Sequence, residues 1–189
     1  MPPGTIFRRG DMTMITRRKL IGLGATAVSM AVARPGWAAA LPARRDLNLH
    51  NIHTGESFSE TYWVNGTYVP DAMAEIRRVL RDHRTNTEHP IDPALLDLLA
   101  GLRAKMQSHE RFEVISGFRS PATNDMLCET TSGVARHSMH PNGKAIDIRL
   151  PGRDLPRLRD AAMAMKRGGV GYYHDSDFVH VDTGPVRHW

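Results

Sequence analysis

The stretch SMHPNGKAIDIRL, residues 138–150, places a turn between a histidine and a strand that carries a carboxylate. The Pro-Asn-Gly run predicts the turn. The alternation in AIDIRL predicts a strand on which Asp147 faces away from its apolar neighbours. Two interpretations fit this pattern. One is an ordinary loop that enters a strand, and the other is a metal site with His140 on the loop and Asp147 on the strand.

The segments before this stretch predict a hairpin and two helices. Residues 46–69 alternate in polarity and contain the turn signals Thr54-Gly55 and Asn65-Gly66, which favours a β-hairpin. Apolar residues at helical spacing predict a helix over residues 71–84, with Asp71 as its N-cap. A second helix is expected over residues 93–106, opened by Asp92-Pro93.

The rest of the chain predicts short strands and two more helices. We expect strands over residues 112–116, 144–150, 169–173 and 178–182, and helices over residues 121–129 and 155–166. Helices come first and short strands follow. We therefore expect an α+β fold, in which helices flank a small antiparallel sheet.

The basic charge of the chain is confined to its first forty residues. The formal net charge is +5, but residues 1–40 hold six of the 25 Lys and Arg and one of the 20 Asp and Glu. Residues 41–189 are therefore formally neutral. A nucleic-acid-binding domain carries a basic surface on its folded part, so we exclude nucleic acid as a partner.

The basic leader resembles an export signal. Residues 16–40, TRRKLIGLGATAVSMAVARPGWAAA, combine Arg17-Arg18 with an apolar run and end in small residues. This pattern is typical of a twin-arginine signal peptide. Its apolar run of about 14 residues is short for a membrane span of about 20, so we expect no span after cleavage. We expect residues 1–40 to be an extension with the signal, and residues 41–189 to be one periplasmic domain.

The single cysteine, Cys128, excludes a disulfide within the chain. It follows Asn-Asp-Met-Leu in a segment with a helical pattern, and we interpret it as a small residue of the core. A cysteine peptidase would instead need this thiol beside a histidine in an exposed cleft.

A third candidate ligand stands in FVHVD, residues 178–182. His180 lies between two valines, so its imidazole faces away from apolar neighbours, as the carboxylate of Asp147 does. Two histidines and one aspartate suit zinc, which would keep a fourth position for water. The alternative is a buried His–Asp hydrogen bond and an unrelated loop histidine, His140.

Three separated motifs resemble the lysostaphin/D-Ala-D-Ala metallopeptidase superfamily, and within it the MepK-like (YcbK-like) murein endopeptidases. They are SxHxxGxAxD over residues 138–147, SGFRSPATN over residues 116–124 and GGVGYYHDSDFVHVDTGPVRHW over residues 168–189. The resemblance implies one zinc ion per chain on the face of the sheet, bound by His140, Asp147 and His180. It also implies hydrolysis of peptide cross-links in peptidoglycan, between diaminopimelate residues.

The same resemblance implies roles for other polar residues. Dipeptidase members place the general base three residues before the last ligand, where this chain has Asp177. Asp182 is the rival base, or else a partner that orients an imidazole. The arginine of SGFRS, Arg119, is implied to bind substrate or stabilise an oxyanion, with a structural ion pair as the alternative. We expect Ser138 to contact the substrate.

Two other functions stay open. A D,D- or L,D-carboxypeptidase would use the same residues to trim uncrosslinked stem peptides. A non-catalytic murein-binding domain would hold zinc structurally, and structural zinc sites are usually closed by four protein ligands.

Export should depend on the two adjacent arginines of the leader. Replacing Arg17 and Arg18 by lysine keeps the charge and removes the twin-arginine pattern, so the precursor should remain in the cytoplasm. Cell fractionation of the variant beside the unchanged chain measures this. Normal delivery of the double variant to the periplasm would show that the leader acts in another way.

Overall fold

The computed structural model describes residues 44–131 and 137–189. The predicted signal peptide and extension, residues 1–40, lie outside this part. The described elements are β1 (Arg44–Asn51), β2 (Ser57–Val64), β3 (Thr67–Tyr68), α1 (Pro70–Val79), α2 (Pro93–Lys105), β4 (Phe112–Ser116), α3 (Pro121–Thr130), the 3₁₀ turn η1 (His140–Asn142), β5 (Ala145–Arg149), α4 (Leu155–Met165), β6 (Gly169–Tyr173), β7 (Phe178–Asp182) and β8 (Arg187–His188). No helix among them is long and apolar enough to cross a membrane.

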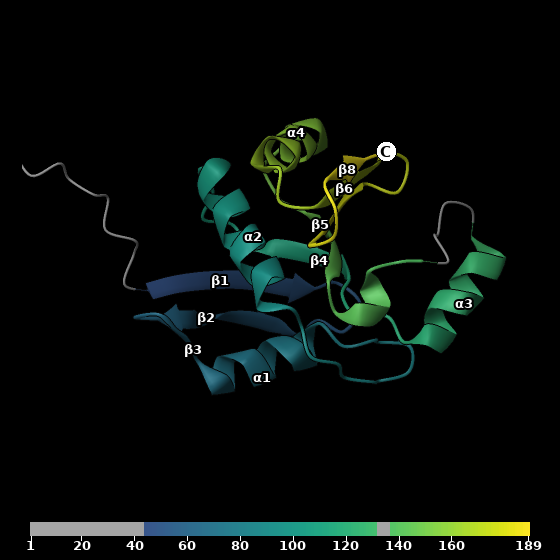
Figure 1. Ribbon diagram of the computed structural model, residues 1–189, viewed down its shortest axis with the longest axis horizontal. Helices are drawn as coiled ribbons and strands as arrows, with labels where there is room; N and C mark the ends of the chain where they lie inside the picture. Colours follow the sequence, from purple (N-terminus) through teal and green to yellow (C-terminus); the bar gives the residue numbers. More distant parts are fainter. Residues whose placement is uncertain (1–43, 132–136) are drawn as a thin grey trace, which may run out of the picture. The chain divides into compact units, whose positions relative to one another are not determined.

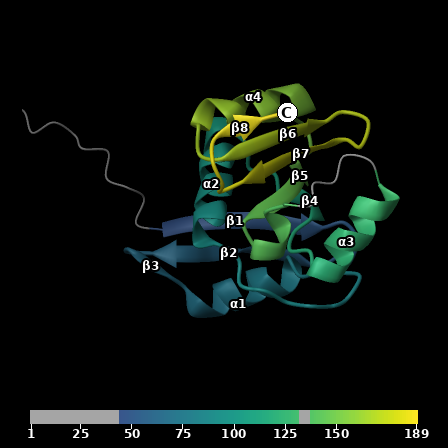
Figure 2. The same ribbon diagram turned by 45° about the vertical axis from the view of Figure 1, so that its right-hand side comes forward.

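The described strands form one mixed sheet, in the order β3-β2-β1-β4-β5-β7-β6-β8 (Figures 1 and 2). β1 runs parallel to β4, and β6 runs parallel to β8, while the other neighbours are antiparallel. The α+β class is confirmed. The expectation of a small antiparallel sheet is wrong, because the segment through α1 and α2 supplies the crossover that a parallel pair needs. The N-terminal hairpin therefore joins the same sheet as the His–Asp motif.

Local signals in the first part of the chain are partly confirmed. The hairpin forms, and the positive φ angles of Asn65 and Gly66, 47° and 93°, make the turn that Asn-Gly favours. Asp92 caps α2 by accepting a hydrogen bond from Ala94 N at 2.9 Å. The Asp71 cap is wrong, because α1 begins at Pro70 and its N-cap residue is Val69.

The helix predicted over residues 71–84 ends early, at Val79. After it the chain turns, and Asp82 N donates to Thr87 O at 2.9 Å. The carboxylate of Asp82 is buried and contacts the segment that precedes α3. This long-range contact, rather than the local helical pattern, fixes the backbone after Val79.

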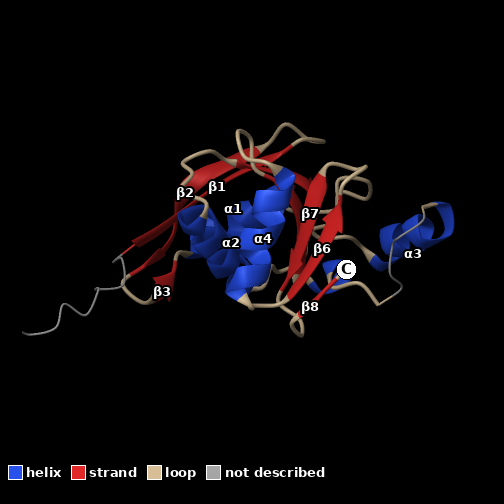
Figure 3. Ribbon diagram, turned by 90° about the horizontal axis from the view of Figure 1, so that it is seen from above, coloured by secondary structure: helices blue, strands red, loops and turns tan. Residues whose placement is uncertain are grey.

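Helices α2 and α4 cover one face of the sheet, and α3 lies on the other side of β6 and β7 (Figure 3). The covered face carries the apolar residues of β5, β6 and β7, which belong to one core cluster with the leucines of α2: Ile146, Ile148, Val170, Val179, Val181, Leu95, Leu96, Leu99 and Leu102. Because side chains alternate along a strand, Asp147 and His180 point to the opposite face. The sheet thus separates the apolar core from the polar candidate site.

Candidate metal centre

Strand pairing brings Asp147 and His180 together. β5 and β7 are antiparallel neighbours, and Asp147 is the register partner of His180. Side chains directly opposite on such a pair have Cβ atoms about 5 Å apart. His140 reaches the same point from η1, immediately before β5.

The turn after His140 requires glycine at position 143. Gly143 has a φ of 63°, and a Cβ there would lie 2.1 Å from Pro90 O, a contact that no side chain could make. Its carbonyl accepts a hydrogen bond from Asp92 N at 2.9 Å. Residues 140–143 therefore pack tightly against the segment before α2, and this contact fixes the direction from which His140 enters.

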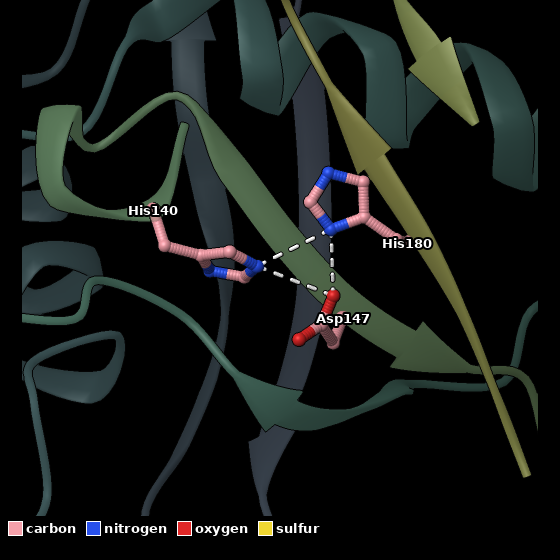
Figure 4. A group of neighbouring side chains, drawn as sticks. All are labelled: His140, Asp147 and His180. Atoms are coloured by element: carbon pink, nitrogen blue, oxygen red, sulfur yellow. Dashed lines mark hydrogen bonds and ion pairs between the residues drawn. The ribbon is translucent and has the colours of Figure 1, made fainter. Parts of the chain in front are cut away.

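The three side chains converge on one point, as Figure 4 shows. His140 Nε2 lies 3.2 Å from Asp147 Oδ1 and 3.2 Å from His180 Nδ1. His180 Nδ1 lies 2.8 Å from Asp147 Oδ1. All three residues are buried, with His140 fully inaccessible. The structure thus brings together the three residues that the sequence singled out as a ligand set.

In each imidazole the outer nitrogen, the one that points away from the other two side chains, donates a hydrogen bond to an acceptor. His140 Nδ1 donates to Gly117 O at 2.6 Å, and His180 Nε2 donates to Asp182 Oδ2 at 3.1 Å. In the neutral rings the inner nitrogens therefore carry lone pairs. Two lone pairs and a carboxylate oxygen repel one another at about 3 Å unless positive charge lies between them.

The pKa shifts follow from burial and from these contacts. Burial lowers the pKa of His140 and keeps its imidazole neutral. For His180 burial acts in the same direction, but hydrogen bonds to Asp147 and Asp182 raise its pKa overall. Burial opposes ionisation of Asp147, yet the two histidines hold the pKa of its carboxyl well below the usual range. The carboxylate is therefore ionised, and the site favours positive charge at its centre.

The donor set fits a zinc ion. Nitrogen and oxygen ligands at about 2.0–2.2 Å from a tetrahedral metal lie roughly 3.3–3.6 Å from one another, somewhat more than the distances of 2.8–3.2 Å found here. A shift of a few tenths of an ångström would admit the ion. Among the described residues the cluster has three members, which would leave a fourth position open.

Arg119 lies beside this cluster and is itself buried. It is 9% exposed, and one of its terminal nitrogens donates to Ser138 Oγ at 3.4 Å. Its Nε is buried without a partner among the described residues. Burial lowers the pKa of Arg119, and the charge of Asp147 opposes this shift. No ion pair joins Arg119 to a carboxylate in the described part, so the structural ion-pair alternative has no support there.

Asn124 is a second unsatisfied group that the sequence interpretation missed. The residue is buried, with 2% of its surface exposed, and its Oδ1 has no hydrogen-bond partner among the described residues. Asn124 and Ser138 line a cavity of about 400 Å³ between α3 and η1, together with Pro121, Asp125, His137, Met139, Pro141 and Asn142. A buried polar atom without a partner costs about 1–3 kcal/mol, so Asn124 Oδ1 keeps a capacity to accept a hydrogen bond that no described residue uses. The position of Asn124 inside the SGFRSPATN motif was the only feature of the sequence that could have identified it.

Asp82 fixes the backbone that carries Arg119. Its Oδ2 accepts hydrogen bonds from Ser120 N at 2.9 Å and Ser120 Oγ at 2.7 Å. Ser120 in turn caps α3 by accepting from Thr123 N at 3.2 Å. Burial opposes ionisation of Asp82, but its hydrogen bonds to Thr123 and Ser120 lower the pKa of the carboxyl. This buried carboxylate had no signal in the sequence.

The two rival bases lie in different surroundings. Asp182 is fully buried, and its oxygens accept from Gly169 N, Gly184 N and Arg187 as well as from His180. Asp177 lies in the turn before β7 with a φ of 52°, and its exposed carboxylate pairs with Arg149 at 3.0 Å.

Arg149 is two residues along β5 from Asp147 and on the same face, about 7 Å further along the strand. Asp177, which pairs with it, therefore lies at the rim of the cluster rather than against it.

Cys128 is half-buried on α3 and is not part of the apolar core, contrary to its interpretation as a core residue. Asn124 Nδ2 lies 3.8 Å from its sulfur. It is not a member of the cluster of His140, Asp147 and His180.

Asp182 should control how tightly the site holds zinc. Asp182→Asn keeps the shape of the side chain and removes the charge that fixes the outer nitrogen of His180. We expect zinc affinity, measured by competition with a chelator, to fall about 10–100-fold, whereas His140→Ala should abolish tight binding. Unchanged affinity would contradict the orienting role, and a loss as complete as that of His140→Ala would place Asp182 among the ligands.

Known proteins resemble the chain over almost its whole length. The family model described as peptidoglycan L,D-endopeptidase MepK matches residues 39–189. The peptidoglycan L,D-endopeptidase MepK of Escherichia coli K12 is 41% identical over 175 residues, covering 92% of this chain and 96% of that protein. A protein of Haemophilus influenzae named probable peptidoglycan L,D-endopeptidase MepK is 37% identical over 176 residues, covering 92% and 95%. The resemblance seen in the three sequence motifs is thereby confirmed, and the chain belongs to the MepK family of peptidases.

Proposed function

We propose that the chain is a zinc-dependent murein endopeptidase, which hydrolyses peptide cross-links in peptidoglycan. The observation that carries this proposal is the buried convergence of His140, Asp147 and His180 beside the guanidinium of Arg119. Membership of a peptidase family makes this arrangement a candidate for peptide-bond hydrolysis.

The donor set supports a catalytic ion over a structural one. Structural zinc sites are usually closed by four protein ligands, often thiolates, and catalytic sites keep one position open. The described cluster has three members and includes no cysteine. Bound here, zinc would supply Lewis-acid chemistry, polarising an amide carbonyl and lowering the pKa of a water molecule.

Arg119, beside the cluster, and Asn124, beside the cavity, each keep one hydrogen-bonding atom that no described residue uses. The Nε of Arg119 donates and the Oδ1 of Asn124 accepts, and both are buried without partners among the described residues. A preorganised guanidinium in a buried site stabilises developing negative charge much more strongly than it would in water. Arg119 would bind the oxyanion or a substrate carboxylate. Ser138 and the cavity beside it would bind the adjoining part of the peptide.

Asp177 is the better candidate for the general base. Asp182 is fully buried and saturated with donors, and these contacts hold the pKa of its carboxyl well below the usual range despite its burial. Asp177 is exposed at the rim of the same face, where its carboxylate contacts Arg149. Catalytic hydrogen bonds are often long in the absence of substrate, so a base at the rim can close on the reacting water through substrate binding.

The names of the relatives suggest the bond that is cut. They are called peptidoglycan L,D-endopeptidases, and we propose for this chain the cross-link between two diaminopimelate residues, in the periplasm. A D,D- or L,D-carboxypeptidase would place the end of an uncrosslinked stem at Arg119 instead. Purified muropeptides of each kind, offered with and without chelator, separate these activities.

Asp177→Asn should slow turnover strongly and leave zinc in place. A base that touches only the reacting water contributes about 10²–10⁴-fold to the rate, and its loss does not alter His140, Asp147 or His180. We expect cleavage of cross-linked muropeptides to fall by that factor, with about one zinc per chain by elemental analysis. Asp175→Asn is the matched control, because Asp175 is a fully exposed acid of the same turn, and it should cleave normally.

Near-normal cleavage by Asp177→Asn would remove Asp177 from the mechanism. If the unchanged chain holds zinc but cleaves no muropeptide, the proposed function itself is wrong, and the non-catalytic murein-binding domain takes its place.

A further inference from the structure

Two glycines on β6 leave a hollow on the face of the sheet that carries the metal centre. Gly171 is the register partner of His180, and a Cβ there would lie 2.7 Å from the indole of Trp189. A Cβ on Gly169 would lie 2.5 Å from Asp182 Oδ2 and 2.6 Å from Arg187 Nη1. A side chain at either position would take space that Asp182 of β7, Arg187 of β8 or Trp189 occupies. The hollow is therefore filled by Arg187 and Trp189.

Arg187 binds the carboxylate of Asp182, which in turn accepts a hydrogen bond from His180. Its Nη1 donates to Asp182 Oδ1 at 3.1 Å and its Nη2 to Asp182 Oδ2 at 2.7 Å. A two-point contact of this kind fixes the plane of a carboxylate as well as its position. Asp182 Oδ2 also accepts the hydrogen bond from His180 Nε2. The orientation of the imidazole is thus coupled to the guanidinium of Arg187.

Trp189 lies against the ring of His180. The two ring centroids are 5.4 Å apart, and the planes meet at 47°. The indole is itself held from two sides, because the guanidinium of Arg187 lies 5.0 Å from its centroid and its Nε1 donates to Tyr173 Oη at 2.9 Å. Its backbone pairs with β6, where Trp189 N donates to Val170 O at 3.2 Å.

We propose that Arg187 and Trp189 are positioning residues of the metal centre. Arg187 acts through Asp182, and Trp189 acts by contact with the imidazole. Together they keep His180 in the rotamer that directs Nδ1 at His140 and Asp147, with Nε2 turned to Asp182. The short strand β8 thereby serves the site and does more than extend the sheet. This inference rests on the proposed metal centre but not on the identity of the substrate.

Zinc affinity and the stability of the metal-free protein test the proposal together. Trp189→Ala and Arg187→Gln should each weaken zinc binding about 10-fold or more, as loss of groups that orient a ligand does. Trp189→Phe keeps an aromatic ring against His180 and should recover most of the affinity. Because Arg187 acts through Asp182, adding Arg187→Gln to Asp182→Asn should weaken zinc binding no further.

Trp63→Ala is the matched control. Trp63 on β2 is also a tryptophan stacked with an arginine, since the guanidinium of Arg45 lies 4.2 Å from its ring centroid. It pairs with β1 and β3, away from the metal centre. Its replacement should lower the melting temperature of the metal-free protein at least as much as Trp189→Ala does, and leave zinc affinity unchanged.

Nitrogen-15 chemical shifts of His180 in the metal-free protein give a readout independent of zinc. The unchanged chain should show Nε2 protonated, and Trp189→Ala should show a mixture of the two tautomers. Full zinc affinity in Trp189→Ala and Arg187→Gln would overturn the proposal, as would a loss that Trp189→Phe does not restore. A chain that binds zinc as expected in all variants but cleaves no muropeptide would refute the proposed function and leave this inference standing.

Discussion

The site depends on the repulsion between three buried electron-rich atoms. His140 Nε2, Asp147 Oδ1 and His180 Nδ1 lie within 3.2 Å of one another, and when both imidazoles are neutral their protons point outward, to Gly117 O and Asp182. A protonated His180 would satisfy the contact with Asp147 but leave the lone pair of His140 without a partner. A divalent cation satisfies all three atoms at once. The surrounding protein thus enforces an arrangement that positive charge stabilises.

The sheet explains how the chain maintains this arrangement. The register of β5 and β7 places Asp147 opposite His180, and the alternation of each strand turns their apolar neighbours toward α2 and α4. A shift of register by one residue would put the ligands into the apolar core. Apolar burial on one face therefore fixes the polar site on the other. The same division of faces leaves room beside the ligands for Arg119 and for the residues of β8.

The cluster of His140, Asp147 and His180 could be predicted from the sequence, because alternation around Asp147 and His180 is a local pattern that the motif resemblance reinforced. The pairing of their strands is a tertiary contact, and no local pattern encodes it. The same limit applies to the parallel pairing of β1 with β4, which made the sheet larger than expected. For Asp182 the sequence left two roles open, a general base or a partner that orients an imidazole. The choice between them depends on the rotamer of His180, which the sequence does not give. Asp82 gave no signal in the sequence, and Asn124 and Trp189 gave only their places inside the motifs, because their roles come from contacts with distant segments.

Anomalous X-ray scattering from crystals equilibrated with zinc tests the central claim most directly. The anomalous difference map from data collected above the zinc absorption edge should show one strong peak per chain, which disappears in data collected below the edge. The peak should lie about 2.0–2.2 Å from His140 Nε2, Asp147 Oδ1 and His180 Nδ1, with Asp182 still bonded to His180 Nε2. Absence of a peak between these atoms, or a zinc ion bound through His180 Nε2 or Asp182, would contradict the account.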